Sequence, residues 1–461
     1  MAATRAERPP RHLAAGASIN VAAQVATITA AGVTSVAVAR LLGPSGTGTL
    51  ALAVTLVAVS TTVFSLGLRS GVIYRVSRGT WASGDATRAA AGSALALGTV
   101  GGLVGLGFYA LTSGSVLQGL SPTMAIVTFA SLPFALAWLF MAAVALALER
   151  YEVYGAITIV QPAAQVVLAV TLAATVGTLG AVLGFAISQV VGTAAAAVLV
   201  RDRDRGAAPP RRAGELRAAA RFGLLSWGSE VLQNLNYRLD LFVLNAFGVT
   251  ADVGVYSVAL TVTSFAWILP SALQTVLFPR TARLDTGDPP ASAEPGGLTD
   301  VELAASRGTR QAVLLLIPTA VALVFTLLVL VPLLYGARFD RTTDLGLILV
   351  PGTLALGFAR VLVAVTSGRG RPQYSLYGRL IDMPITAVLY FVLIPAHGAT
   401  GAAIASSISY ALTGVISFVF FRRVVDLPLR TLLVPTRADL EDWRSAGRAV
   451  RRRLRGAAEA P

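Results

Sequence analysis

The chain has 461 residues, of which 55% are hydrophobic and only 13% are charged. A soluble chain of this length carries about 25% charged residues in about three domains, so the composition excludes that class and favours one polytopic membrane domain. The chain has no cysteine, and its two histidines, His12 and His397, lie far apart in the sequence. We therefore expect no disulfide, no thiol chemistry, no metal, no cofactor and no catalytic residue.

Twelve apolar stretches are long enough to cross a bilayer as helices, which takes about 20 residues each. They occupy residues 14–39, 46–68, 90–112, 122–148, 155–176, 178–200, 222–247, 253–278, 311–335, 345–367, 376–395 and 397–421. These stretches predict an all-α polytopic membrane protein with about twelve transmembrane helices.

Arginine supplies all the basic charge, because the chain has 37 Lys+Arg residues and none is lysine. With the N-terminus inside, 32 arginines fall in cytoplasmic segments and three, Arg40, Arg338 and Arg341, in outer loops. Since cytoplasmic loops are enriched in basic residues, this predicts a cell inner (cytoplasmic) membrane protein with both termini cytoplasmic. The net charge of +14 then reflects orientation and attraction to anionic membrane lipids, and no nucleic-acid partner is expected.

The two halves of the chain repeat one another weakly. Residues 42–56 are echoed by 247–262, and LGAVLGFAIS at 179–188 is echoed by TGAAIASSIS at 400–409. Each half holds six predicted helices, so both halves have the same orientation, and a parallel pseudo-two-fold axis relates two six-helix lobes. The predicted organisation is a cytoplasmic tail (1–13), an N-lobe (14–200), a basic linker (201–221), a C-lobe (222–421) and a basic cytoplasmic tail (422–461).

The seventh predicted helix carries a polar stripe on an otherwise apolar sequence. The stripe consists of Glu230, Asn234 and Arg238, with Gln233, Tyr237 and Asp240 on the adjoining edge. Ionisable residues at membrane depth face a cavity or a partner. In one interpretation the stripe lines a substrate cavity and Arg238 contacts a pyrophosphate or an acidic sugar. In the other, Arg238 pairs with Glu230 or Asp240. A carboxylate at this depth could also bind a coupling proton or cation.

Two further helices carry polar residues at membrane depth. The first helix has a milder stripe of Asn20, Gln24 and Thr27, which either lines the same cavity or joins helices together. Arg360 lies in the middle of the tenth helix, where we expect cavity contact or a partner, with Asp382 as a candidate by depth alone.

After the last apolar stretch the chain becomes basic. Thr436 and Asp439 form a helix start, and apolar residues follow along one side while arginines gather towards residue 455. Two interpretations stay open: a helix lying on the membrane surface, or a solvated tail.

Several segments resemble a known family. ARLLGPSGTGTLALAVTL at 39–56 and SLGLRSGVIYR at 65–75 resemble the start of an O-antigen-type polysaccharide-unit lipid flippase. Residues 237–260 resemble the start of that family's second half, and 393–410 its last two helices. The family belongs to the multidrug/oligosaccharidyl-lipid/polysaccharide exporter superfamily. The resemblance implies two six-helix lobes around a central cavity, and a flippase that moves an undecaprenyl-pyrophosphate-linked oligosaccharide by alternating access.

Two other functions stay open. A cation-coupled multidrug antiporter of the same superfamily predicts acidic, aromatic cavity walls, whereas two arginines lie at mid-span here. A membrane-embedded polysaccharide polymerase or glycosyltransferase needs a large outer loop, for which the chain has little room, so we expect no enzyme. The expected partners are a polyprenyl-pyrophosphate-linked glycan, anionic lipids and other membrane proteins of polysaccharide assembly.

Overall fold

The computed structural model describes residues 11–77, 83–200, 213–284, 299–371, 373–437, 439 and 441, and its regular elements there are all helical. The first eight helices are α1 (Arg11–Phe64), α2 (Leu68–Ser77), α3 (Ser83–Thr112), α4 (Pro122–Ala130), α5 (Leu132–Ala147), α6 (Tyr151–Val176), α7 (Thr178–Val200) and α8 (Ala213–Phe247). The remaining elements are α9 (Thr250–Ser264), η1 (Phe265–Trp267), α10 (Ile268–Leu284), α11 (Asp300–Phe325), η2 (Thr326–Leu330), α12 (Val331–Tyr335), η3 (Ala337–Phe339), α13 (Asp340–Gly368), α14 (Gln373–Arg422) and α15 (Leu429–Leu433).

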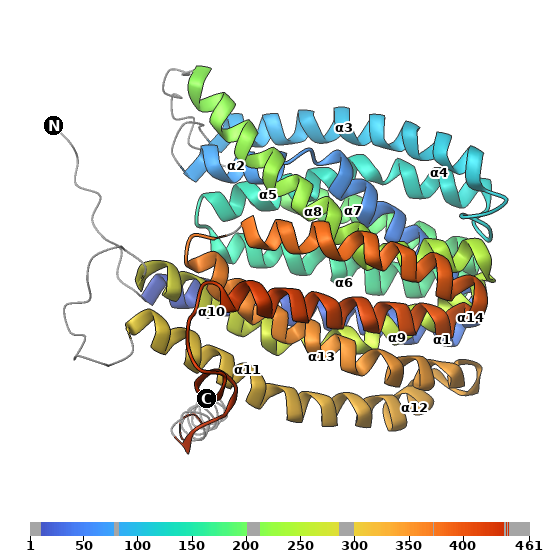
Figure 1. Cartoon of the computed structure of the whole chain (residues 1–461). Coiled ribbons are helices and arrows are strands. Elements are labelled where there is room, and N and C mark those ends of the chain that lie inside the picture. Colours follow the sequence, from blue (N-terminus) through green and yellow to red (C-terminus); the bar gives the residue numbers. More distant parts are fainter. Residues whose placement is uncertain are drawn as a thin grey trace, which may run out of the picture. The chain divides into compact units, whose positions relative to one another are not determined.

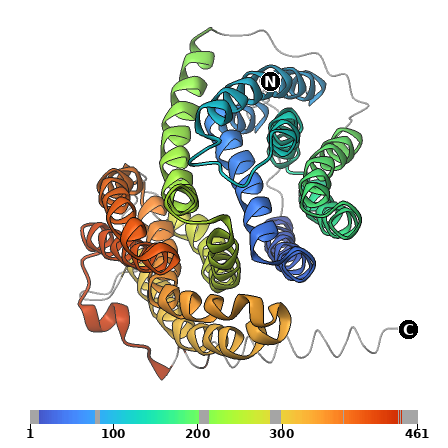
Figure 2. The same cartoon turned by 90° about the vertical axis from the view of Figure 1, so that its right-hand side faces the viewer.

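The chain divides into two compact units. Unit 1 comprises Met1–Phe265, Phe325–Leu349 and Arg379–Ser409, and unit 2 comprises Ala266–Val324, Val350–Gly378 and Tyr410–Pro461. Within unit 1, α1 packs against α6 and α9, α3 against α5, and α6 against α7 (Figure 1). Figure 2, turned by 90°, looks along the paired helices of residues 151–200. The N-lobe and C-lobe boundaries drawn from the sequence stay a prediction.

In the described part of the chain, nine helices are long and apolar enough to cross a membrane. Two of them, Ala22–Phe64 and Gln373–Arg422, bend at Gly43 and Gly398 and so supply two crossings each. Helix α8 is more polar, because Glu230, Arg238 and Asp240 fall within its apolar part. With α8 these segments match the twelve predicted stretches, and the predicted all-α polytopic membrane fold is confirmed.

Two helices that correspond in the sequence repeat cross backbone to backbone in unit 1. A Cβ on Gly48 of α1 would lie 2.0 Å from the carbonyl oxygen of Thr250, and a Cβ on Gly254 of α9 would lie 1.9 Å from that of Pro44. Pro44 lies four residues before Gly48, and Thr250 lies four residues before Gly254. The two contacts are therefore reciprocal, as a two-fold axis requires.

The loops beside this crossing are tied together by side chains. Gln118 donates to the carbonyl oxygen of Gly248 at 2.8 Å, and Asn245 donates to that of Val116 at 2.8 Å. At the start of α9, Asp252 pairs with Arg341 of α13 at 3.1 Å. This end of unit 1 thus joins loops from both halves of the sequence.

The last hairpin of each half repeats one further contact. A Cβ on Gly180 would lie 1.9 Å from the carbonyl oxygen of Leu172, and a Cβ on Gly401 would lie 2.0 Å from that of Leu393. Each glycine lies eight residues after the leucine whose carbonyl oxygen it would contact. Gly180 and Gly401 occupy equivalent positions in the two segments whose sequences echo one another. The weak sequence repeat therefore corresponds to a repeated backbone geometry.

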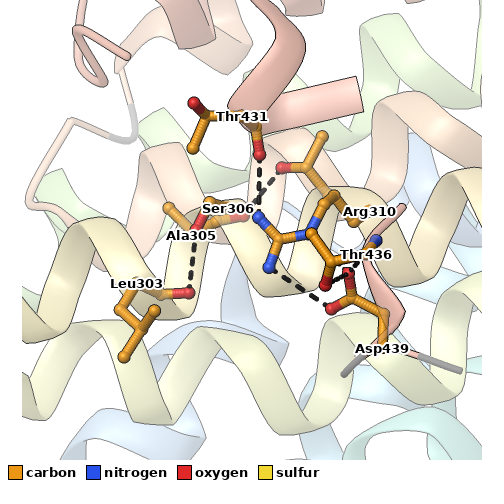
Figure 3. Close-up of polar contacts among 8 residues, drawn as sticks. Leu303, Ala305, Ser306, Arg310, Thr431, Thr436 and Asp439 are labelled. Atoms are coloured by element: carbon orange, nitrogen blue, oxygen red, sulfur yellow. Dashed lines mark hydrogen bonds and ion pairs between the residues drawn. The ribbon is translucent and has the colours of Figure 1, made fainter. Parts of the chain in front are cut away.

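Beyond α14, the chain folds back onto unit 2. Leu432 of α15 is fully buried beside Ala305, Leu362 and Phe421. Arg310 of α11 donates from Nε to Asp439 at 2.6 Å, from Nη2 to the same carboxylate at 3.3 Å and from Nη1 to the Thr431 carbonyl at 2.8 Å (Figure 3). A buried ion pair thus anchors the beginning of the tail.

Asp439 also receives hydrogen bonds from the backbone N–H and the hydroxyl of Thr436, at 2.8 and 2.6 Å, which confirms the predicted helix start. Burial alone raises the pKa of Asp439, but the hydrogen bonds from Arg310 and Thr436 and the charge of Arg310 outweigh it and hold the pKa below its usual range. The contact therefore stabilises the fold above the ordinary carboxyl pKa and is lost as the pH falls through the lowered value. The arginine-rich remainder of the predicted tail helix lies outside the described residues.

Candidate functional site

Helix α8 places the predicted polar stripe in a half-buried position. Arg69 of α2 contacts Glu230, with 3.4 Å between Nη1 and Oε1. Asn234 donates from Nδ2 to the hydroxyl of Thr62 at 2.8 Å, and Gln233 donates to the Tyr237 hydroxyl at 3.3 Å. The partner of Glu230 is therefore Arg69 from the preceding half of the chain.

Arg238 is also half-buried, and it makes no hydrogen bond or ion pair with any residue in the described ranges. Its positive charge acts on the neighbouring carboxylate of Asp240, which is fully buried. Within the described ranges, the donors of this guanidinium therefore have no acceptor.

Asp240 is one of two buried aspartates in the described part of unit 1. It accepts hydrogen bonds from the hydroxyl of Tyr256 at 2.7 Å, from the hydroxyl of Ser406 at 3.4 Å and from the backbone N–H of Leu241 at 2.8 Å. The hydroxyls of Tyr256 and Ser406 lie 2.8 Å apart. Residues of α8, α9 and α14 thus converge on one carboxylate.

Asp382 of α14 is the other buried aspartate in the described part of unit 1, with 2% of its surface exposed. Asn236, one turn before Asp240, donates to it at 2.8 Å, and Thr386 donates at 3.4 Å. Tyr390 links the two aspartates, because its hydroxyl lies 3.0 Å from that of Ser406 and 3.4 Å from the Asn236 carbonyl oxygen.

We call this continuous set of buried polar groups the two-aspartate network. It comprises Asn236, Asp240, Tyr256, Asp382, Thr386, Tyr390, Ser406 and Ser409. One acceptor in it, Oδ1 of Asn236, is buried and has no hydrogen-bond partner in the described part of the chain. Two carboxylates, several hydroxyls and a vacant amide oxygen are oxygen ligands that suit a proton or a hard cation.

The N-terminal half carries a neutral counterpart of this network. Gln161 of α6 donates to the hydroxyl of Ser188 on α7 at 3.2 Å. Ser188 is equivalent to Ser409 in the echoed sequences. The hydroxyl of Ser409 lies 2.6 Å from the hydroxyl of Thr386. Only the C-terminal copy adds an aspartate to this helix pair, so the two halves differ in charge at equivalent places.

Arg360 lies in unit 2, on the part of α13 that follows Gly357. Its Nη1 donates to the hydroxyl of Ser271 on α10 at 3.3 Å, and its guanidinium carbon lies 4.8 Å from the ring centroid of Trp267. Tyr410 meets the same indole edge-on, with 6.2 Å between ring centroids. In the described ranges no carboxylate pairs with Arg360, and its buried Nε has no acceptor.

The stripe predicted on the first helix is only partly described. The side chain of Asn20 lies outside the described residues, and Gln24 is exposed. Thr27 donates to the carbonyl oxygen of Ala23 at 2.9 Å, within its own helix.

Several residues of these sites were not predicted. Nothing in the sequence distinguishes them from other residues of the apolar stretches in which they lie: Tyr256, Tyr390, Ser406 and Trp267. The one signal in the sequence was the spacing of Asn236 and Asp240, which puts both on one helix face. Asp240, which the sequence places on the adjoining edge of the stripe, is fully buried.

Comparison with known proteins gives one family match. The model of a family described as polysaccharide biosynthesis protein matches residues 37–344. A search of the curated proteins finds no match.

Three solved structures share the fold at low sequence identity. The lipid II flippase MurJ, in an inward closed conformation, matches with a TM-score of 0.70 and 12% identity, over 89% of this chain and 88% of that one. An inward-facing multidrug resistance transporter of the MATE family matches with a TM-score of 0.65 and 16% identity, over 87% and 94%. A MOP superfamily transporter from Pyrococcus furiosus matches with a TM-score of 0.59 and 15% identity, over 90% and 95%.

Proposed function

The chain belongs to the polysaccharide biosynthesis protein family, and we propose that it is a flippase for an undecaprenyl-pyrophosphate-linked oligosaccharide, used in building cell-surface polysaccharide. The chain is a multi-pass membrane protein whose fold matches those of a lipid II flippase and of drug transporters. No enzymatic step is part of the proposal. The glycan-lipid is the proposed substrate, and anionic lipids and other assembly proteins are proposed partners.

One observation carries the choice of an anionic, lipid-linked substrate. Arg238 and Arg360 lie in apolar helices and, in the described part of the chain, neither is ion-paired with a carboxylate. A guanidinium at membrane depth is costly, so an arginine without a partner there is best explained by a ligand. Its forked donors match phosphate oxygens in geometry.

Alternating access is the proposed mechanism. The pyrophosphate-sugar head enters between the N-lobe and the C-lobe from the cytoplasmic side, while the lipid tail stays in the bilayer. Glu230, Gln233, Asn234, Tyr237 and Arg238 of α8, with Asn20 and Gln24 of α1, are the proposed lining. A change in the tilt of the lobes then exposes the head to the outer side.

The two-aspartate network supports coupling of this movement to a cation or a proton. It also favours the second candidate function, a cation-coupled multidrug antiporter, which predicts buried acidic and aromatic groups. The substrate distinguishes the two functions. A flippase mutant accumulates a lipid-linked glycan, whereas an antiporter mutant becomes sensitive to cationic drugs.

We expect Arg238→Ala and Arg360→Ala each to lower glycan export about tenfold or more, because each removes a charged hydrogen bond to the substrate. The measurement is mass spectrometry of lipid-linked glycans in a deletion strain that carries each variant. Arg341→Ala is the matched control, since that arginine is 60% exposed and pairs with Asp252. Surface polysaccharide at the native level in both variants contradicts the proposed substrate contact.

Orientation is tested separately, by labelling single cysteines that are introduced into a chain with no native cysteine. The exposed residues Ser115 and His397 lie in proposed outer loops, and Asp426 lies in the proposed cytoplasmic tail. We expect Ser115→Cys and His397→Cys to react with a membrane-impermeant maleimide in intact cells, and Asp426→Cys to react only after lysis. The reverse pattern contradicts cytoplasmic termini.

A further inference from the structure

The environment of Arg360 differs from those of three other arginines, Arg310, Arg69 and Arg341. Arg310 has all three nitrogens of its guanidinium bonded to Asp439 or Thr431 (Figure 3). Arg69 and Arg341 pair with Glu230 and Asp252. In these three cases a carboxylate compensates the charge, so the contacts explain the arginine as part of the structure.

Arg360 is compensated by an aromatic ring instead. The face of Trp267 attracts the guanidinium through its quadrupole, and it brings no negative charge that would compete with an anion. Nη1 of Arg360 donates to the hydroxyl of Ser271. Among the described residues, neither Nε nor Nη2 of Arg360 has an acceptor. The guanidinium therefore keeps a full positive charge and unused donors.

The indole is itself held in place within unit 2. Tyr410 is 2% exposed and meets Trp267 at an interplanar angle of 73°, an edge-to-face arrangement that aromatic pairs prefer. Gly357, one turn before Arg360, faces Pro270, which lies between Trp267 and Ser271 in sequence. The contacts that orient the guanidinium thus come from three segments that pack together.

We propose that Arg360 is an oxyanion-binding residue and that Trp267 is its positioning residue. The inference rests on the proposed function and deepens it: the ligand is the pyrophosphate of the polyprenyl carrier. A ring that orients an arginine without neutralising it lets the site bind the anion and release it, whereas a carboxylate partner would have to be displaced at each cycle.

The test is binding of polyprenyl pyrophosphate without sugar to the full-length chain in phosphatidylcholine nanodiscs. Arg360→Lys keeps the charge but loses the fork, and we expect it to weaken binding about tenfold. Trp267→Leu removes the ring, and we expect a loss of about fivefold or more. Trp267→Phe keeps a ring and is expected to bind within about twofold of native. Arg341→Ala controls for general loss of positive charge.

The outcomes separate this inference from the proposed function. If the native chain does not bind polyprenyl pyrophosphate, the proposed function fails. If it binds and the Arg360→Lys and Trp267→Leu variants bind equally well, only the present inference is overturned. Competition by phosphatidylglycerol as strong as that by inorganic pyrophosphate also overturns it, because the site then recognises a phospholipid headgroup. Rescue by Trp267→Phe supports a positioning role even if Trp267→Leu fails to fold.

Discussion

Gly254→Ala is expected to destabilise the folded protein by about 3 kcal/mol, which is at the upper end of overpacking effects. The added Cβ would lie 1.9 Å from the Pro44 carbonyl oxygen, and that atom belongs to backbone that no rotamer change can move aside. Helices α1 and α9 would have to separate along their crossing. The measurement is the fraction of monodisperse protein left after heating in detergent.

Gly48→Ala is expected to behave in the same way, because the two contacts are reciprocal. Gly107 of α3 is the matched control: it is a glycine in an apolar helix, and a Cβ built on it meets nothing within 4 Å. Gly107→Ala should leave stability unchanged or raise it slightly, since alanine favours a helix. Equal heat resistance of Gly107→Ala and Gly254→Ala would mean that the helices do not cross so closely.

This crossing illustrates which part of the fold could be predicted from the sequence. The apolar runs predicted the helices, and the paired glycine turns at 42–56 and 247–262 predicted a repeat, because both patterns are local. That the two copies pack against each other through Gly48 and Gly254 is a long-range property, and neither segment alone contains a signal for it. The repeated contacts of Gly180 and Gly401 stay within one hairpin each, so the sequence echo alone was enough to relate them.

The candidate sites show the same division. Arg238, Asp240 and Arg360 stand out because a charge in an apolar helix is expensive wherever it lies. The partners of the buried aspartates do not stand out. Asp240 bonds Tyr256 and Ser406, which lie 16 and 166 residues away, and Asn236 bonds Asp382 across 146 residues. Tyrosine and serine are common in membrane helices, so composition does not reveal which ones meet a buried carboxylate.

The two-aspartate network leads to the second large effect. Asp240→Asn and Asp382→Asn keep the shape of each side chain but remove the charge that a cation or proton would neutralise. Hydrogen bonds to a charged group contribute about 1.5–3 kcal/mol. We therefore expect the rate of gradient-driven transport to fall about tenfold or more in each variant. The measurement is flipping in proteoliposomes with an imposed sodium or proton gradient.

Ser188→Ala is the matched control, because it removes a buried hydroxyl from the neutral counterpart, where Gln161 bonds it at 3.2 Å. It should leave the dependence on the gradient unchanged. Slow flipping without a gradient should persist in both asparagine variants, since the arginines proposed to bind the substrate are intact. A coupling role for the network is contradicted if either gradient still stimulates both variants as it does the native chain. In that case the two carboxylates stabilise the packing alone, and the gradient acts through other groups of the chain.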